Sequence, residues 1–113
     1  MKKIEAIIKP SKLSNVKDAL HEIGLSGMTV SDVKGFGRQR GQDGGLNTSP
    51  DYDDEFRVKI KIELIIENQL VAKALEAIKN AAYSGKIGDG KIFIYTIDQV
   101  IRIRTGEKDS DAV

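Results

Sequence analysis

Residue types that support catalysis or cross-linking are scarce in this chain. Its 113 residues contain no cysteine, and His21 is the one histidine. The lack of cysteine excludes disulfides, thiolate nucleophiles and cysteine metal sites, and one histidine cannot build a multi-histidine centre. The length suits a single domain, residues 1–113.

An excess of charge and a long apolar run are also missing. The chain has 18 basic and 17 acidic residues, a net charge of +1, so nothing electrostatic favours a nucleic-acid or membrane-surface binder. Its first residues lack the apolar core of a signal peptide, and no apolar run is long enough to span a bilayer. We therefore expect a cytoplasmic globular protein with no nucleic-acid partner and no direct membrane insertion.

Hydrophobic periodicity divides the rest of the chain into regular elements. The clearest alternation of apolar and charged residues runs from Phe56 to Ile66. We expect Ser11 or Ser14 to cap the first helix, Gly24 to end it, and Asn68 to cap the second helix. The predicted strands are residues 2–9, 28–35, 56–66, 91–97 and a short 100–105, and the predicted helices are residues 16–23 and 71–82.

This order of elements is a repeated β-α-β unit. It predicts an α+β fold, a ferredoxin-like βαββαβ sandwich of four antiparallel strands with both helices on one face, followed by a short extra C-terminal strand. The other face of the third strand carries Arg57, Lys59, Lys61 and Glu63, and then the apolar Ile65. A face that is charged at one end and apolar at the other suits a homo-oligomer packed sheet to sheet.

Residues 37–55 carry no periodic pattern. Connections in compact domains are usually about 4–6 residues long, and structureless ones beyond about 15 are commonly functional. We expect a mobile loop here, with an inert insertion as the plain alternative. The stretch from Gly35 to Gly41 combines glycines, which leave N–H groups open, with two arginines that can bind phosphate or carboxylate. The polar tail, residues 107–113, is expected to be flexible.

A second glycine-rich turn, from Gly85 to Lys91, has the spacing Gly-x4-Gly-Lys. It matches the start of a P-loop, but Ile92 stands where Ser or Thr is needed and a strand follows instead of a helix, so we reject that interpretation. A backbone nest beside a lysine is still a reasonable phosphate cradle, and a plain turn is the alternative. Arg102 and Arg104 fall about 7 Å apart on one strand face. They suit a polyanion, unless they are solvated charges on an edge strand.

These anion-seeking features come without a catalytic constellation. No Ser/His/Asp set is present, and His21 fits a helix surface better than a base. We therefore predict binding and not turnover, so not an enzyme. An RNA-recognition module of the same fold would need exposed aromatics and a basic face, and a small phosphatase would need an evident nucleophile or base.

Several stretches of the chain together resemble the PII signal-transduction family. They are residues 3–10, 27–30 with 33–39, 58–63, 84–93 and 101–107. The stretch 84–93, Ser-Gly-Lys-Ile-Gly-Asp-Gly-Lys-Ile-Phe, is the most specific. The resemblance implies a ferredoxin-like homotrimer that binds ATP or ADP in the clefts between subunits. It also implies that a long T-loop, residues 37–55, controls a target protein in nitrogen metabolism.

The resemblance implies ligand residues by position. Mg²⁺–ATP and 2-oxoglutarate bind together in such proteins, with Gln39 at the metal and Lys59 at the keto acid. A dicarboxylate beside three phosphates needs positive charge. Arg102 and Arg104 would come from the neighbouring subunit. The other residues implied to line the site, together with Gln39 and Lys59, are Ile7, Thr29, Gly35, Gly37, Arg38, Lys61, Glu63, Ile65, Gly88, Asp89, Gly90 and Lys91.

The interior of the T-loop departs from the family pattern, whose tip usually reads Tyr-Arg-Gly-Ala/Ser-Glu-Tyr. Tyr52 lies beside the modifiable position in different surroundings, and Ser49 precedes Pro50. Residues 42–55 contain five acids and no base, which favours a basic partner surface and leaves the target open. The alternative is a divergent, unmodified member that senses the adenylate ratio or a small anion such as bicarbonate, with a partner outside nitrogen control.

Overall fold

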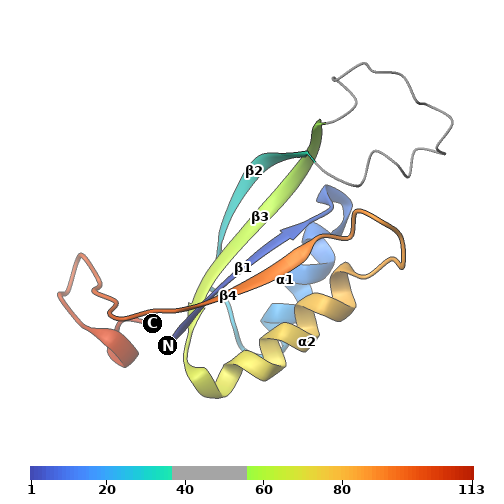
Figure 1. Cartoon of the computed structure of the whole chain (residues 1–113). Helices are drawn as coiled ribbons and strands as arrows, with labels where there is room; N and C mark the ends of the chain where they lie inside the picture. The colour runs from blue at the N-terminus through green and yellow to red at the C-terminus, as the bar shows by residue number, and fades with distance from the viewer. Residues whose placement is uncertain (37–55) are drawn as a thin grey trace, which may run out of the picture.

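The computed structural model describes residues 1–36 and 56–113 (Figure 1). The T-loop predicted at residues 37–55 lies outside the described residues. The elements are, in chain order, β1 (Lys2–Ile8), the 3-10 turn η1 (Pro10–Lys12), α1 (Leu13–Glu22), β2 (Thr29–Phe36), β3 (Phe56–Ile66), the 3-10 turn η4 (Asn68–Leu70), α2 (Val71–Ala82), β4 (Lys91–Thr96) and the 3-10 turn η5 (Asp109–Asp111). No helix in the two described ranges is long and apolar enough to cross a bilayer.

The four strands form one antiparallel sheet in the order β2-β3-β1-β4. β1 pairs with β3 on one side and with β4 on the other, so that Glu5 lies opposite both Glu63 and Phe93. Both helices lie on the same side of the sheet (Figure 1). This arrangement confirms the predicted ferredoxin-like α+β fold. On β3, the candidate site residues Lys59, Lys61, Glu63 and Ile65 alternate with the core residues and therefore lie on the face that the helices leave open.

The hydrophobic core lies between the sheet and the two helices. The alternation in β3 places Ile60, Ile62, Leu64 and Ile66 in it, all nearly inaccessible to solvent. Phe56 and Val58 share this register but are 55% and 57% exposed. Their end of β3 extends beyond the helices (Figure 1), so neither helix covers them. The remaining core side chains are Ile4, Ala6, Ile8, Val16, Leu20, Ala74, Ile78 and Ala82.

Neither helix begins with the predicted side-chain cap. Each is entered through a 3-10 turn, with Lys12 before α1 and Leu70 before α2, and no side chain caps either start. Ser11 and Asn68 lie inside those 3-10 turns. The i→i+3 backbone hydrogen bonds of such a turn take the place of a side-chain cap at the start of the helix. The predicted end of α1 is confirmed. Gly24 has φ 90°, and Leu25 N donates to the Leu20 carbonyl at 3.0 Å, as in a Schellman motif.

The predicted strand at residues 100–105 does not form. Ile101 makes a single bridge with Lys108, because the segment turns back on itself and β4 pairs only with β1. Val100 N donates to Asp109 Oδ1 at 3.2 Å, and Asp109 N donates to the Val100 carbonyl at 2.8 Å. The C-terminal tail is therefore folded against its own preceding residues, while its flexibility stays a prediction.

Candidate functional site

A pocket of about 450 Å³ opens where the end of β2, the start of β3 and the glycine turn before β4 converge. Backbone pairing explains the convergence, because Ile7 lies opposite Lys91 on one side and Lys61 on the other. The predicted site residues in the pocket are Ile7, Gly35, Lys59, Gly88, Gly90 and Lys91. Further lining residues are Phe36, Arg57, Ile87 and Phe93.

The shape of the glycine turn depends on two positions that strongly favour glycine. Gly90 has φ 102°, and a Cβ added there would lie 1.7 Å from the Ile7 carbonyl oxygen. The backbone of the turn thus packs directly against β1. Gly88 has φ 101° as well, a conformation that residues with a Cβ rarely adopt. The turn therefore brings bare backbone to the pocket wall, as an anion-binding nest requires.

Lys59 connects β3 to this turn. Its side chain is only 7% exposed, and its Nζ donates to the Gly88 carbonyl oxygen at 2.6 Å. Burial lowers the pKa of Lys59, as do the nearby positive charges of Lys9 and Arg57, while the Asp89 carboxylate opposes the shift. An anion in the pocket would relieve this charge crowding, so the site is electrostatically prepared for a negative ligand.

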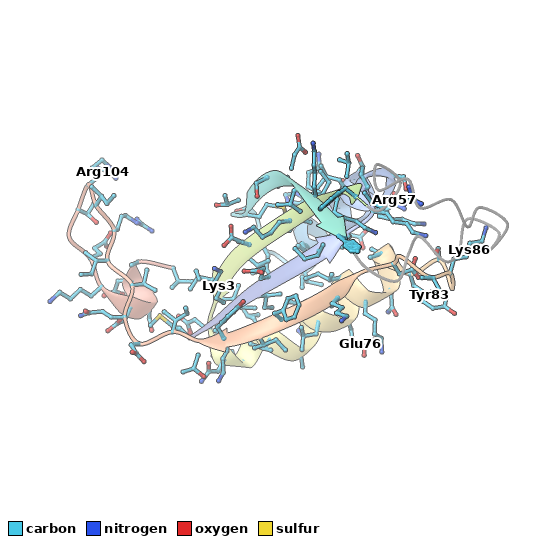
Figure 2. The ribbon with its side chains drawn as sticks, turned by 45° about the horizontal axis from the view of Figure 1, so that its top comes forward. Lys3, Arg57, Glu76, Tyr83, Lys86 and Arg104 are labelled. Carbon is cyan, nitrogen blue, oxygen red and sulfur yellow. The ribbon has the colours of Figure 1, made fainter. Side chains whose placement is uncertain are left out.

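Lys91 supplies a second ammonium group at the pocket. It is the first residue of β4, is exposed, and forms no ion pair or side-chain hydrogen bond with the described residues. Arg57 adds a guanidinium to the lining and extends at the same end of the molecule as Lys86 (Figure 2). Three cationic side chains beside the backbone of the glycine turn can bind an anion with several oxygens, such as a phosphate chain or a di- or tricarboxylate.

Asp89 lies in the same turn but lines a neighbouring hollow instead of the pocket. It accepts hydrogen bonds from the backbone N–H groups of Ser84 at 2.7 Å and Gly85 at 2.9 Å, and from the Ser84 hydroxyl. Lys9 Nζ lies 3.2 Å away. Burial alone raises the pKa of Asp89, but these hydrogen bonds outweigh it and hold the pKa well below its usual range. Its carboxylate therefore organises the turn.

The other predicted site residues lie elsewhere. Thr29, Glu63 and Ile65 line a second hollow of about 420 Å³ on the open face of the sheet, where Lys3 Nζ pairs with Glu63 at 2.7 Å. Lys61 lies beside Ile7 in the sheet. Arg104 lies at the opposite end of the molecule from Lys86 (Figure 2), and Arg102 precedes it by two residues in the same turn. Gly37, Arg38 and Gln39 lie outside the described residues.

Comparison with known proteins identifies the family. A family model described as Nitrogen regulatory protein P-II matches residues 1–107. The chain is 60% identical to the nitrogen regulatory protein P-II of Rhodospirillum rubrum and 50% identical to the nitrogen regulatory protein P-II 1 of Escherichia coli, in each case over the full length of both proteins. The crystal structure of Arabidopsis thaliana PII bound to citrate has a TM-score of 0.81 and 38% identity, over 99% of this chain and 91% of that one.

The chain belongs to the P-II family. Membership confirms the resemblance and the ferredoxin-like fold, and the relatives are named as regulatory proteins and not as enzymes. Within the described residues, no group of three or more histidines, aspartates and glutamates could hold a metal ion.

The P-II resemblance did not identify every residue of the pocket. Phe36, Arg57, Ile87 and Phe93 were not predicted as site residues, although alternation already placed Arg57 on the open face. Gly35 lies opposite Arg57 in the ladder, a pairing that follows from the register of β2 and β3. The Phe36 and Phe56 rings close this ladder, with centroids 5.6 Å apart. The pocket therefore lies directly beside the point where the chain leaves for residues 37–55.

Proposed function

We propose that this chain binds ATP or ADP with the phosphates in the pocket of Lys59 and Lys91, and that the bound state controls a protein target of nitrogen metabolism. The single observation that carries the proposal is the convergence of two lysines, Arg57 and the glycine turn on one pocket. Nucleotide phosphates offer many charged oxygens to such a group of donors.

The second hollow supports the nucleoside half of the proposal. Glu63 offers carboxylate oxygens that can accept from ribose hydroxyls, and Ile65 offers an apolar surface for a base. Within one chain, this hollow and the pocket are separate, and neither is lined by Arg102 or Arg104. We therefore propose a homotrimer in which the nucleotide lies in a cleft between subunits and the two arginines come from the neighbour.

Mg²⁺ and 2-oxoglutarate belong to the same proposal. Lys59 supplies an ammonium group for one carboxylate of the keto acid, and that carboxylate would offset the nearby positive charges of Lys9 and Arg57. The Arabidopsis relative was crystallised with citrate, and a tricarboxylate resembles such a ligand in charge. Gln39, outside the described residues, is proposed to hold Mg²⁺ together with the ATP phosphates, which would supply the metal's remaining oxygens.

The proposed output is a change in the T-loop. It is flanked by Phe36, which lines the pocket, and by Phe56, whose ring packs against that of Phe36. A ligand that moves Phe36 therefore acts on the base of residues 37–55, and a shift in their population would reach a partner. The acidic interior favours a basic surface on that partner, and we propose that this regulation takes place in the cytoplasm.

Calorimetry with ATP and ADP, each with and without Mg²⁺ and 2-oxoglutarate, tests the proposal. We expect ATP and 2-oxoglutarate to strengthen each other's binding when Mg²⁺ is present. Nucleotide binding that 2-oxoglutarate leaves unchanged would favour a sensor of the adenylate ratio or of another anion. No nucleotide binding at all would overturn both.

A lysine variant tests the pocket itself. Lys91→Ala should weaken ATP binding about ten- to a hundredfold, because a hydrogen bond to a charged group contributes about 1.5–3 kcal/mol. The matched control is Lys86→Ala, which removes the same charge from an exposed position of the same turn that does not line the pocket. Equal losses in both variants would mean that only the general charge of the turn matters.

A further inference from the structure

Lys9 connects the end of β1 to the glycine turn without lining the pocket. Its Nζ lies 3.1 Å from Ser84 Oγ and 3.2 Å from Asp89 Oδ1. The side chains of Lys9 and Asp89 are about one-fifth exposed, at 21% and 22%, so water screens their attraction only in part. The pair thus joins two segments that are far apart in the sequence.

The shape of the turn depends on the Asp89 carboxylate. That group accepts the N–H groups of Ser84 and Gly85, which fixes the first half of the turn. On the other side, Lys59 donates to the Gly88 carbonyl at 2.6 Å. The turn is therefore held at two points, once by a lysine that lines the pocket and once by one that does not.

The Asp89 carboxylate also creates an electrostatic problem. It stands between Gly88 and Gly90, both of which line the pocket, and its hydrogen bonds keep it ionised. A negative charge at this position repels an anionic ligand. Lys9 is the cation closest to that carboxylate among the ion pairs of the described residues, so it offsets the repulsion while it anchors the turn.

We infer that Lys9 is a positioning residue of the anion pocket, which holds the turn through Asp89 and offsets the charge of that carboxylate. The inference rests on the proposed nucleotide binding. A residue that acts through another has a distinct signature, since its effect disappears when the intermediary is removed. A direct ligand contact would keep its effect in either background.

The test is a double-mutant cycle on the full chain, with ATP affinity measured by calorimetry. Lys9→Met should weaken ATP binding about tenfold when Asp89 is present and less than about twofold in the Asp89→Asn background. Lys9→Arg should recover most of the affinity, because it keeps the charge. Lys12→Met, in the adjacent turn η1, is the control and should bind as the wild type does.

Amide spectra supply a second measurement. In ¹H–¹⁵N correlation spectra, Lys9→Met should shift the Ser84 and Gly85 resonances, whereas Lys12→Met should not. An equal loss of affinity in both Asp89 backgrounds, or an unchanged affinity with a lowered Tm, would overturn the inference and leave the proposed function standing. If the wild type binds no nucleotide, the proposed function fails and the inference fails with it.

Discussion

Two turns at opposite ends of the molecule carry basic residues, and they are built in different ways (Figure 2). The glycine turn of residues 85–91 is bonded to other elements, through Lys59 from β3 and Lys9 after β1. The turn of residues 102–107 is held by hydrogen bonds and an ion pair between its own residues. Arg102 N donates to the Glu107 carbonyl at 2.8 Å, and the side chains of the same two residues pair at 3.2 Å.

The difference suggests that a single chain can form the phosphate pocket of the proposed site but not bring the arginines of the C-terminal turn to it. The glycine turn is organised by its own sheet, so the phosphate half should exist before any ligand or neighbour arrives. The C-terminal turn holds Arg104 and Ile103 in solvent, with Ile103 99% exposed. Single exposed apolar side chains are normal on a protein surface, so it is the proposed trimer, and not this exposure, that would give the turn its role.

Gly90→Ala should have the largest effect. The new Cβ would lie 1.7 Å from the Ile7 carbonyl oxygen at φ 102°, so the turn must move away from β1. We expect a cost of more than about 2 kcal/mol, a fall in Tm of roughly 10 °C and the loss of tight ATP binding. Calorimetry and thermal melts at one protein concentration would measure these effects.

Gly106→Ala is the matched change in the C-terminal turn. Gly106 also has a positive φ, 73°, but a Cβ there meets nothing within 4 Å. It should cost only about 1 kcal/mol, which is the strain of the backbone conformation alone. Equal falls in Tm for the two variants would contradict the claim that close packing against β1 distinguishes the glycine turn.

Mixed trimers would test whether the two turns meet across subunits. Lys91→Ala and Arg104→Ala should each weaken ATP binding when assembled alone. When the two variants are unfolded together and refolded, random assortment should restore about one quarter of the sites, each with Lys91 from one chain and Arg104 from its neighbour. Calorimetric stoichiometry would count those sites.

The control mixture combines Arg102→Ala with Arg104→Ala. Both arginines of a site would come from the same neighbour, so no assortment of these two chains restores a complete pair. Recovery in the control, or none in the Lys91 mixture, would mean that the arginines do not complete a neighbour's site.

Local sequence patterns predicted the features that depend on interactions within a few residues. Alternation defined β3, and Gly24 ended α1, because period and backbone freedom act within a few residues. Contacts between distant segments were not predictable in this way. Lys9 and Ser84 are 75 residues apart, and no periodic pattern tells which charges will meet. The strand predicted at residues 100–105 failed for the same reason, since a strand needs a neighbour to pair with.

The two turns should also differ in how their contribution to stability responds to acid. Because the folded pKa of Asp89 lies below its unfolded value, the unfolded chain binds more protons as the pH falls, and the stabilisation by this carboxylate is lost below about pH 4. Asp89→Asn should therefore cost about 1 kcal/mol of stability at pH 7, which lowers Tm by roughly 5 °C. Below pH 4 the difference in Tm from the wild type should become progressively smaller.

Glu107→Gln is the corresponding change in the C-terminal turn. Its pair with Arg102 is nearly half exposed, at 45% and 44%, and such pairs contribute about 0–1 kcal/mol. We expect a smaller loss of Tm at pH 7 than for Asp89→Asn. If Glu107→Gln costs as much as Asp89→Asn, the C-terminal turn is as firmly held as the glycine turn, and its arginines are preorganised without a neighbour.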